Sequence, residues 1–323
     1  MTPKTLLDQI REFQNSRIIL TGFELGVFTI INDTGKTTAE VALAIHADTR
    51  GIDRLLNALV ALDLLEKNDQ IFTNTTFAAQ FLVKGKPDYL GGINHSINLW
   101  KTWSTLTEAV VAGHKVATSE MQFRQSGAIE GFIHAMHDRA FKAAPAIIAK
   151  LNLTGVKKVL DVGGGSGAYS MGFVNAGDIS ATVFDLPDVV NVSQKFIDKE
   201  GFTGRISTLA GDYLVDDFGN GYDLVFLSAI VHINSYDENK MLIQRCADTL
   251  NAGGQIVIQD YIMNDNRTQP SRGTAFALNM LVGTDYGDTY TETEVAEWFT
   301  AAGLKNIHRI DAIDGNSLMI GRK

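Results

Sequence analysis

The sequence has little of three features, and each shortage excludes a class of protein. It contains a single cysteine, Cys246, so no disulfide can form within the chain, and we expect a reducing, cytoplasmic setting. No apolar run approaches the ~18 to 20 residues of a membrane-spanning helix, and residues 1–13 have no signal-peptide core. Basic residues are also scarce: 28 Lys and Arg face 37 Asp and Glu, a net charge of −9, which argues against a nucleic-acid partner.

The 323 residues are enough for two domains, and residues 1–95 have the pattern of a winged helix. A capping box at Thr37 and Glu40 predicts the start of one helix. Apolar residues at steps of three and four predict a second helix over 52–62. A short hairpin is then predicted over 65–72.

Winged helices often bind DNA, but the charge of this one argues otherwise. Residues 1–95 carry nine Lys and Arg and eleven Asp and Glu, and nine minus eleven is −2. The helix that would enter the groove carries Asp53 and Asp63, which phosphates would repel. We therefore favour a dimerisation or substrate-lid role over a transcription regulator.

Residues 96–150 are predicted to be helical and rich in aromatic side chains, which either pack between domains or line a substrate pocket. These aromatic residues include Trp100, Trp103, Phe123, Phe132 and Phe141. His134 and His137, three apart beside Asp138, have a spacing that can hold a metal. No third and fourth ligand are evident, so we predict no metal site.

From residue 157 onward strands and helices alternate, which predicts an α/β fold with a Rossmann-like, doubly wound sheet. Strands are predicted at 158–162, 181–185, 206–210, 223–227, 255–260, 306–311 and 317–321. The last two are joined by a turn sequence, Asp314-Gly315-Asn316, so they form a hairpin. One strand of the sheet must therefore run antiparallel, which is not how a dinucleotide-binding fold of the usual kind ends.

The stretch Val159–Gly167 runs from a predicted strand directly into glycines, the pattern of a nucleotide-binding loop. Glycines supply the backbone angles of a tight turn and let a ligand approach the main chain. Asp161 precedes the first glycine by two residues, and a carboxylate there favours a cationic ligand such as S-adenosylmethionine over a pyrophosphate. NAD remains an alternative, because a permissive form of its fingerprint is also present.

Polar residues also stand at the end of each predicted parallel strand. Ligands of doubly wound sheets lie at the carboxyl ends of the strands. There, Asp185 can accept ribose hydroxyls and Asp212 an adenine amino group. The fourth strand is followed by Ser228 and His232, and the fifth by Asp260.

These motifs together resemble the class I S-adenosylmethionine-dependent O-methyltransferases. More narrowly, the chain is similar to the acetylserotonin and caffeic acid O-methyltransferase group and its bacterial relatives, over nearly its whole length. The resemblance rests on Asp161–Gly167, Phe184–Pro187, Gly211–Tyr213 and Leu250–Gly254. It implies S-adenosylmethionine as cofactor, a small aromatic or conjugated acceptor, and a homodimer.

The resemblance also implies domains and residue roles. Residues 1–95 would be a winged-helix dimerisation domain, 96–150 a helical linker and pocket wall, and 151–323 the methyltransferase domain. The cofactor residues would be Asp161, Gly163, Gly165, Asp185, Leu186, Asp212, Tyr213, Ser228 and, by a looser match, Arg139. The acceptor pocket would include Met136, Phe276, Asn279 and Met280, although helical Met and Phe residues equally suit a core. An amide such as Asn279 on an apolar helix face needs a partner, which a substrate hydroxyl or ketone can supply.

His232 matches the general base of the group. A phenol has an ordinary pKa near ~10 and an imidazole near ~6.5, so an imidazole can take the phenol proton during methyl transfer. The chain departs from the group in reading His232-Ile-Asn-Ser-Tyr, where the group has His-Asp-Trp, and in placing Thr289 where a second acid is usual. Either Asp260 or Asp288 can orient the base. Transfer without a base, transfer to nitrogen or carbon, and loss of methyl transfer stay open.

Overall fold

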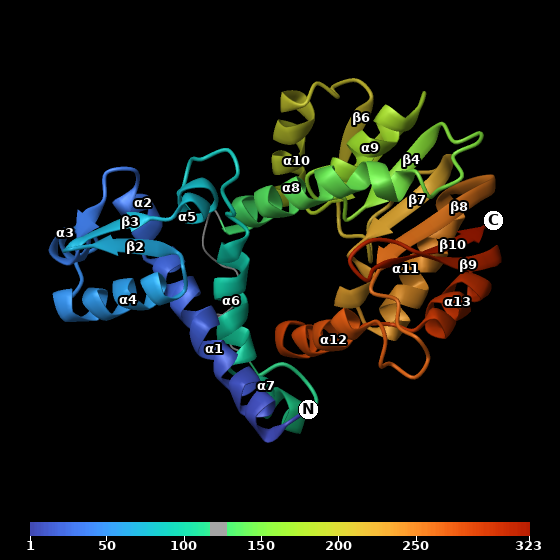
Figure 1. The fold of residues 1–323 in the computed structure, drawn as a ribbon. Helices are drawn as coiled ribbons and strands as arrows, with labels where there is room; N and C mark the ends of the chain where they lie inside the picture. The colour runs from blue at the N-terminus through green and yellow to red at the C-terminus, as the bar shows by residue number, and fades with distance from the viewer. Residues whose placement is uncertain (117–127) are drawn as a thin grey trace. The chain divides into compact units, whose positions relative to one another are not determined.

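The computed structural model describes residues 1–116 and 128–323, and only the backbone of residues 128–132, 134, 135 and 138. The chain divides into two compact units, Met1–Trp100 and Lys101–Lys323 (Figure 1). Within the described ranges, no helix combines the length and the apolar character needed to cross a membrane.

The first unit is mainly helical and contains a small three-stranded sheet. Its elements are α1 Pro3–Glu24, α2 Val27–Ile31, β1 Lys36–Thr37, α3 Thr38–Ala44, α4 Thr49–Ala61, β2 Leu65–Asn68, β3 Ile71–Asn74 and α5 Thr76–Phe81. Helix α6, Ile93–Trp103, continues into the second unit. β2 and β3 form the expected hairpin, and β1 pairs with the other side of β3.

Local sequence accounts for this part of the fold. The Thr37 side chain accepts a hydrogen bond from the Glu40 amide, and the Glu40 carboxylate accepts one from the Thr37 amide at 2.7 Å, which starts α3 as predicted. On α4, the predicted apolar face is buried at Ile52, Leu56 and Leu59. The helix, helix and hairpin order is therefore confirmed.

The second unit is built on one seven-stranded sheet. Its strands are β4 Lys158–Val162, β5 Ser180–Asp185, β6 Ile206–Ala210, β7 Tyr222–Ser228, β8 Leu250–Asp260, β9 Lys305–Asp311 and β10 Ser317–Arg322. All seven predicted strands are confirmed. The largest difference is β8, which begins at Leu250 rather than at residue 255. Leu250 pairs with Tyr222, and an irregularity in the ladder between Tyr222 and Leu224 accommodates Asn251–Gly254.

The strand order is β6-β5-β4-β7-β8-β10-β9. The chain enters at β4, adds β5 and β6 on one side, and then returns to place β7 and β8 on the other. The order therefore reverses between β4 and β7, the position at which doubly wound sheets bind ligands. β10 runs antiparallel to both β8 and β9, so the predicted antiparallel strand is confirmed.

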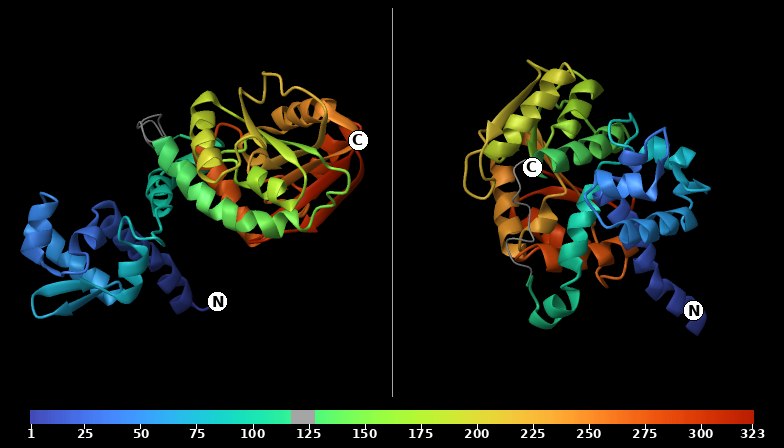
Figure 2. Two further views of the ribbon diagram at one scale, coloured as in Figure 1. Left: turned by 90° about the horizontal axis from the view of Figure 1, so that it is seen from above. Right: turned by 90° about the vertical axis from the view of Figure 1, so that its left-hand side faces the viewer.

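Helices cover both faces of this sheet. The remaining helices are α7 Leu106–Ala112, α8 Ala128–Ile148, α9 Ala168–Ala176, α10 Pro187–Lys199, α11 Tyr236–Thr249, α12 Ser271–Gly283 and α13 Glu292–Ala301. Figure 2 shows α8, α9 and α10, coloured green to olive, gathered on one side of the sheet, where they pack on residues such as Val159. α11 and α13 pack on alternate residues of the same strands, such as Leu160. Cys246 of α11 is a core residue, as predicted, and burial raises the pKa of its thiol.

Candidate active site

The glycine loop lies between β4 and α9 and leaves its backbone open to a ligand. Gly163, Gly165 and Gly167 have φ values of 65°, 55° and 77°, which L side chains rarely adopt. A Cβ at Gly163 would also overlap the Ile230 side chain. The amide of Gly163 donates to the Phe184 carbonyl at 2.8 Å, which holds the loop against β5. Glycines at these three positions therefore let the chain adopt this tight loop, which presents its main chain to a ligand.

Asp161 lies beneath this loop, at 1% exposure. Its carboxylate accepts a hydrogen bond from the Ser170 hydroxyl at 2.7 Å, and burial raises its pKa to about 6. The sequence suggested that Asp161 points toward a cationic ligand. In the structure one of its carboxylate oxygens is hydrogen-bonded to Ser170 of α9, a partner that sequence reasoning missed.

Asp185 stands at the end of β5 and contacts the loop directly. One carboxylate oxygen accepts the Gly165 amide at 2.8 Å and the other accepts the Leu186 amide at 2.7 Å. Burial raises the pKa of this carboxyl. Each oxygen has a second lone pair, so the group retains the capacity to accept ribose hydroxyls. The neighbouring Leu186 side chain is 53% exposed at the same edge and offers an apolar surface to a flat base.

The other expected cofactor residues are spread along this edge. Asp212 is exposed after β6, and its carboxylate accepts the Leu214 amide at 2.9 Å. Ser228, at the end of β7, donates to the Gln259 side chain at 3.4 Å. Arg139 of α8 is mostly exposed and lies 4.0 Å from Asp314 of the β9–β10 turn. Arg139 therefore lies on the outer, exposed side of this carboxyl edge of the sheet.

His232 and Asp260 form the central contact of the site. His232 lies in a single 3₁₀ turn, Val231–Ile233, just after β7, and Asp260 ends the neighbouring strand β8. The imidazole Nδ1 is 3.0 and 2.9 Å from the two carboxylate oxygens, and both side chains are largely buried. A carboxylate only accepts, so Nδ1 carries the hydrogen and donates it. In the neutral ring, Nε2 is then left as a proton acceptor.

The expected pocket residues of α12 lie beside this pair. The Phe276 and His232 rings are perpendicular to each other, with 4.8 Å between their centroids, and Tyr261 packs against the same phenyl ring. Asn279 is half-buried and its side-chain oxygen accepts the Trp103 indole N–H at 2.9 Å. The sequence predicted that this amide needs a partner, and the structure supplies one from the protein itself, the Trp103 indole. Met280 is buried, whereas Met136 of α8 is half-buried.

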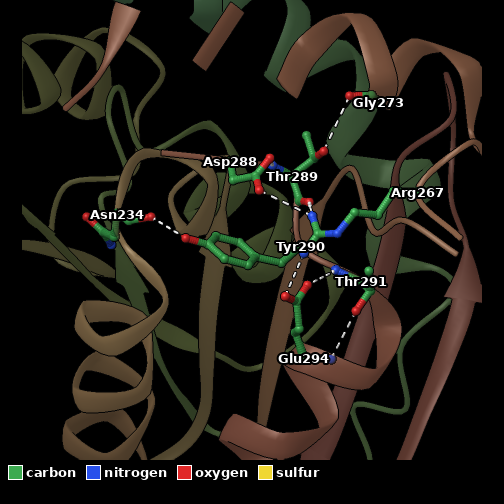
Figure 3. Close-up of polar contacts among 8 residues, drawn as sticks. All are labelled: Asn234, Arg267, Gly273, Asp288, Thr289, Tyr290, Thr291 and Glu294. Atoms are coloured by element: carbon green, nitrogen blue, oxygen red, sulfur yellow. Dashed lines mark hydrogen bonds and ion pairs between the residues drawn. The ribbon is translucent and has the colours of Figure 1, made fainter. Parts of the chain in front are cut away.

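Asp288 pairs with an arginine rather than with His232. Figure 3 shows its carboxylate paired with the Arg267 guanidinium, at 3.2 Å, while the same arginine binds Glu294 at 2.6 Å. Thr289 stands where the resemblance places a second acid, and its buried hydroxyl donates to the Gly273 carbonyl at 3.4 Å. Of the two acids left open by the sequence, the structure brings only Asp260 to the imidazole.

His137 is hydrogen-bonded to the glycine loop. Its Nδ1 forms a 2.9 Å hydrogen bond with the Ser166 hydroxyl, and its ring stacks on Phe141 and Phe196. The side chains of its proposed metal-site neighbours, His134 and Asp138, lie outside the described residues, as do those of Phe123 and Phe132. Sequence spacing alone gave no signal for the bond to Ser166, because the two residues are 29 positions apart.

Comparison with known proteins finds the same family along the chain. Residues 103–305 match the model of an O-methyltransferase domain, and residues 7–84 match that of an O-methyltransferase dimerisation domain. The chain is 30% identical over 315 residues to 3-hydroxy-5-methyl-1-naphthoate 3-O-methyltransferase of Streptomyces sahachiroi, which covers 95% of this chain and 91% of that enzyme.

Two further relatives extend the comparison. The chain is 25% identical over 327 residues to acetylserotonin O-methyltransferase of Gallus gallus, covering 94% of this chain and 93% of the relative. The solved structure of PigF with SAH superposes with a TM-score of 0.89 over all of both chains. At 22% sequence identity, that likeness shows a shared fold.

The buried carboxyl of Asp161 makes stability depend on pH. The folded chain holds this proton up to about pH 6, whereas an ordinary aspartate releases it near 3.8. The folded state therefore binds more protons between these values, and the free energy of unfolding falls as pH rises through them, by up to about 3 kcal/mol. Asp161→Asn keeps an acceptor for Ser170 and removes this loss. We expect the variant to be the more stable protein at about pH 7.5, with a smaller difference at about pH 5.

Urea unfolding at the two pH values measures this effect. Asp178→Asn is the matched control, because Asp178 is exposed and its pKa is lowered by hydrogen bonding to Lys157. That variant should gain no stability as pH rises. An Asp161→Asn protein that is less stable than the parent at the higher pH would contradict the burial argument.

Proposed function

Because the chain belongs to the family of S-adenosylmethionine-dependent O-methyltransferases, we propose that it methylates a hydroxyl of a flat aromatic acceptor with His232 as general base. The observation that carries this proposal is the hydrogen-bonded pair of His232 and Asp260 at the carboxyl edge of the sheet. The family assignment also decides between the two cofactors that the glycine loop left open, in favour of S-adenosylmethionine.

The residues at this edge fit S-adenosylmethionine. The glycine loop offers main-chain groups without side chains, Asp185 keeps free lone pairs for ribose hydroxyls, and Leu186 exposes an apolar face beside it. We assign Asp212 and Tyr213 to the adenine end, and Gly163, Gly165 and Ser228 to the methionine end. Asp161 would support the cofactor site from beneath the glycine loop, and Arg139 would contact the cofactor from the outer side of this edge. When bound, the cofactor supplies a methyl group on a positively charged sulfur.

The remaining chemistry belongs to the protein. Asp260 holds the Nδ1 hydrogen of His232, so the Nε2 lone pair is available to the acceptor hydroxyl. Nε2 takes the hydroxyl proton as the acceptor oxygen becomes the nucleophile, and the resulting imidazolium is stabilised by the Asp260 carboxylate. The Phe276 ring limits the positions that the imidazole can adopt. Methyl transfer is an in-line displacement, so most of the rate acceleration comes from positioning the reacting groups, which these side chains provide.

An aromatic acceptor suits the side chains around His232. Phe276 of α12 packs against both Tyr261 and His232, and Trp103 is hydrogen-bonded to Asn279 of the same helix, so aromatic rings offer flat apolar surface at both of these residues of α12. The Streptomyces sahachiroi relative is named for a hydroxynaphthoate. We therefore propose a fused-ring phenol as the acceptor class.

We also propose that the protein is a homodimer joined through its first unit. The side chains of Leu6, Ile10 and Phe13 on α1 are all exposed at steps of four and three, so they share one helical face. An apolar stripe of this kind on a soluble chain indicates an interaction surface. The match of residues 7–84 to a dimerisation domain supports the same conclusion. A cytoplasmic location remains our prediction from the single cysteine.

The catalytic proposal predicts that His232→Ala lowers the rate and spares the cofactor site. We expect S-adenosylhomocysteine to bind parent and variant alike in calorimetry, while kcat falls by about 10²- to 10⁴-fold. The acceptors to test are 1-naphthol and 2-naphthol, with 2-naphthylamine to separate transfer to oxygen from transfer to nitrogen. Failure of S-adenosylhomocysteine to bind the folded parent would overturn the proposed function.

Asp260→Asn and Asp288→Asn form a matched pair that tests the orienting acid. Asp260→Asn should lower kcat by about 10²-fold or more, because an amide can also donate and so no longer enforces the Nδ1–H tautomer. Asp288→Asn removes only a contact to Arg267 and should leave kcat within about threefold of the parent. Equal losses in the two variants would remove Asp260 from its assigned role.

The dimer proposal predicts that Ile10→Glu with Phe13→Glu yields a monomer, because two buried charges would then face the interface. Sedimentation velocity measures the change in mass. Leu43→Glu is the control, since Leu43 is 77% exposed on α3, away from the α1 stripe. A parent protein that sediments as a monomer, or a double variant that stays dimeric, would contradict the proposal.

A further inference from the structure

A buried polar network holds the turn that carries His232, and Asn234 is at its centre. Asn234 is 5% exposed, although it lies only two residues after the base. Its side-chain oxygen accepts the Tyr213 hydroxyl at 2.9 Å and its side-chain nitrogen donates to Asn239 at 3.1 Å. Its main-chain carbonyl accepts the Tyr290 hydroxyl at 2.6 Å, the contact drawn in Figure 3. Three separate segments therefore meet on this one residue.

The direction of each hydrogen bond in the network follows from one carbonyl. The Val231 carbonyl only accepts, so the atom of the Asn239 side chain that faces it at 2.7 Å must be the nitrogen. The Asn239 oxygen then faces Asn234, which must present its own nitrogen there. The Asn234 oxygen is consequently left for Tyr213, whose hydroxyl must donate. The donor and acceptor atoms of the Asn234 and Asn239 side chains are therefore all defined. Turning either amide over would place two donors or two acceptors against each other.

Packing contacts outside this network also confine the His232 turn. A Cβ at Gly287 would overlap the His232 carbonyl, so the 287 loop lies directly against the turn on one side. The Ile230 side chain, just before the turn, contacts Gly163 of the glycine loop on another. A turn confined in this way shifts only if one of its attachments shifts. The attachments on the cofactor side are Ile230 and Tyr213.

Tyr213 directly follows Asp212, which we assign to the adenine end of the cofactor site. Its main chain is also anchored, because the Arg245 side chain donates to the Tyr213 carbonyl at 3.2 Å. Its hydroxyl is therefore the part of the residue that reaches the His232 turn. A ligand that orders Asp212 and Tyr213 must also order the donor to Asn234.

We propose that Asn234 is a positioning residue that couples occupation of the adenine end of the site to the placement of His232, through the Tyr213 hydroxyl. This inference rests on the proposed function, because it takes the β6 end as the adenine site and His232 as the base. This chain reads His232-Ile233-Asn234 where its group has His-Asp-Trp, and the proposal gives Asn234 a role at that position. The placement of His232 would therefore depend on the conformation of Tyr213, which a bound adenine would fix.

Adenosine tests the coupling without reaching the base, since it occupies the adenine and ribose positions and lacks the amino-acid end. Protein labelled with ¹³C at histidine Cε1 gives one signal for each imidazole, and His232→Ala identifies that of His232. We expect adenosine to shift this signal in the parent. At adenosine concentrations that calorimetry shows to saturate each protein, Tyr213→Phe should lose the shift. Asn234→Ala should lose it as well.

Tyr222→Phe is the matched control, because it also removes a buried phenol hydroxyl, here one that donates to the Phe218 carbonyl at 2.9 Å. It should keep the adenosine-dependent shift. Tyr290→Phe should change the starting position of the His232 signal and keep its response, since it removes contacts from the side of the 287 loop and leaves the Tyr213 hydroxyl in place.

The outcomes separate this inference from the function on which it rests. If neither adenosine nor S-adenosylhomocysteine binds the folded parent, the cofactor assignment fails and the coupling fails with it. If both bind and adenosine leaves the His232 signal unmoved, or if Tyr213→Phe responds like the parent, the coupling alone is overturned.

Discussion

The parallel pairing of β7 with β8 is the constraint on which the rest of the site depends. Its register places Ser228 opposite Gln259, so Asp260 extends one residue beyond the end of β7, beside the turn that follows it. β10 pairs with the other side of β8 and sets Ser317 opposite Asp260. The acid therefore belongs to a strand held on both edges, and it is positioned to hold the imidazole of the neighbouring turn. A slip of this register would separate the pair.

Buried polar groups around the glycine loop are each satisfied by a neighbour, and together they make the loop rigid. Asp161 is paired with Ser170, His137 with Ser166, and Asp185 with the Gly165 amide. These partners come from α9, α8 and β5, so three elements hold a segment that has almost no side chains of its own. An unpaired polar group in this low-dielectric region would cost about 1 to 3 kcal/mol. Rigidity allows the loop to present its main chain to a ligand without further ordering.

The fold follows closely from local sequence patterns. The capping box at Thr37, the apolar face of α4 and all seven strands of the large sheet are readable because each depends on residues within a few positions of one another. The early start of β8 was missed for the same reason. Asn251–Gly254 has the composition of a turn and forms an irregularity in the β7–β8 ladder, and it joins the strand through Leu250, which pairs with Tyr222, and through bonds between Gly253, Gly254 and Lys323.

The sequence by itself determined the family of folds, the cofactor loop and the set of strand ends at which polar residues gather, because motif and periodicity are local. Only the tertiary structure decided which of those residues meet. It brought Asp260 rather than Asp288 to His232, gave Asn279 the Trp103 indole as partner, and made Asn234 the centre of a network. Hydrogen bonds extend about 3 Å, and residues up to 176 positions apart come that close only in the folded chain.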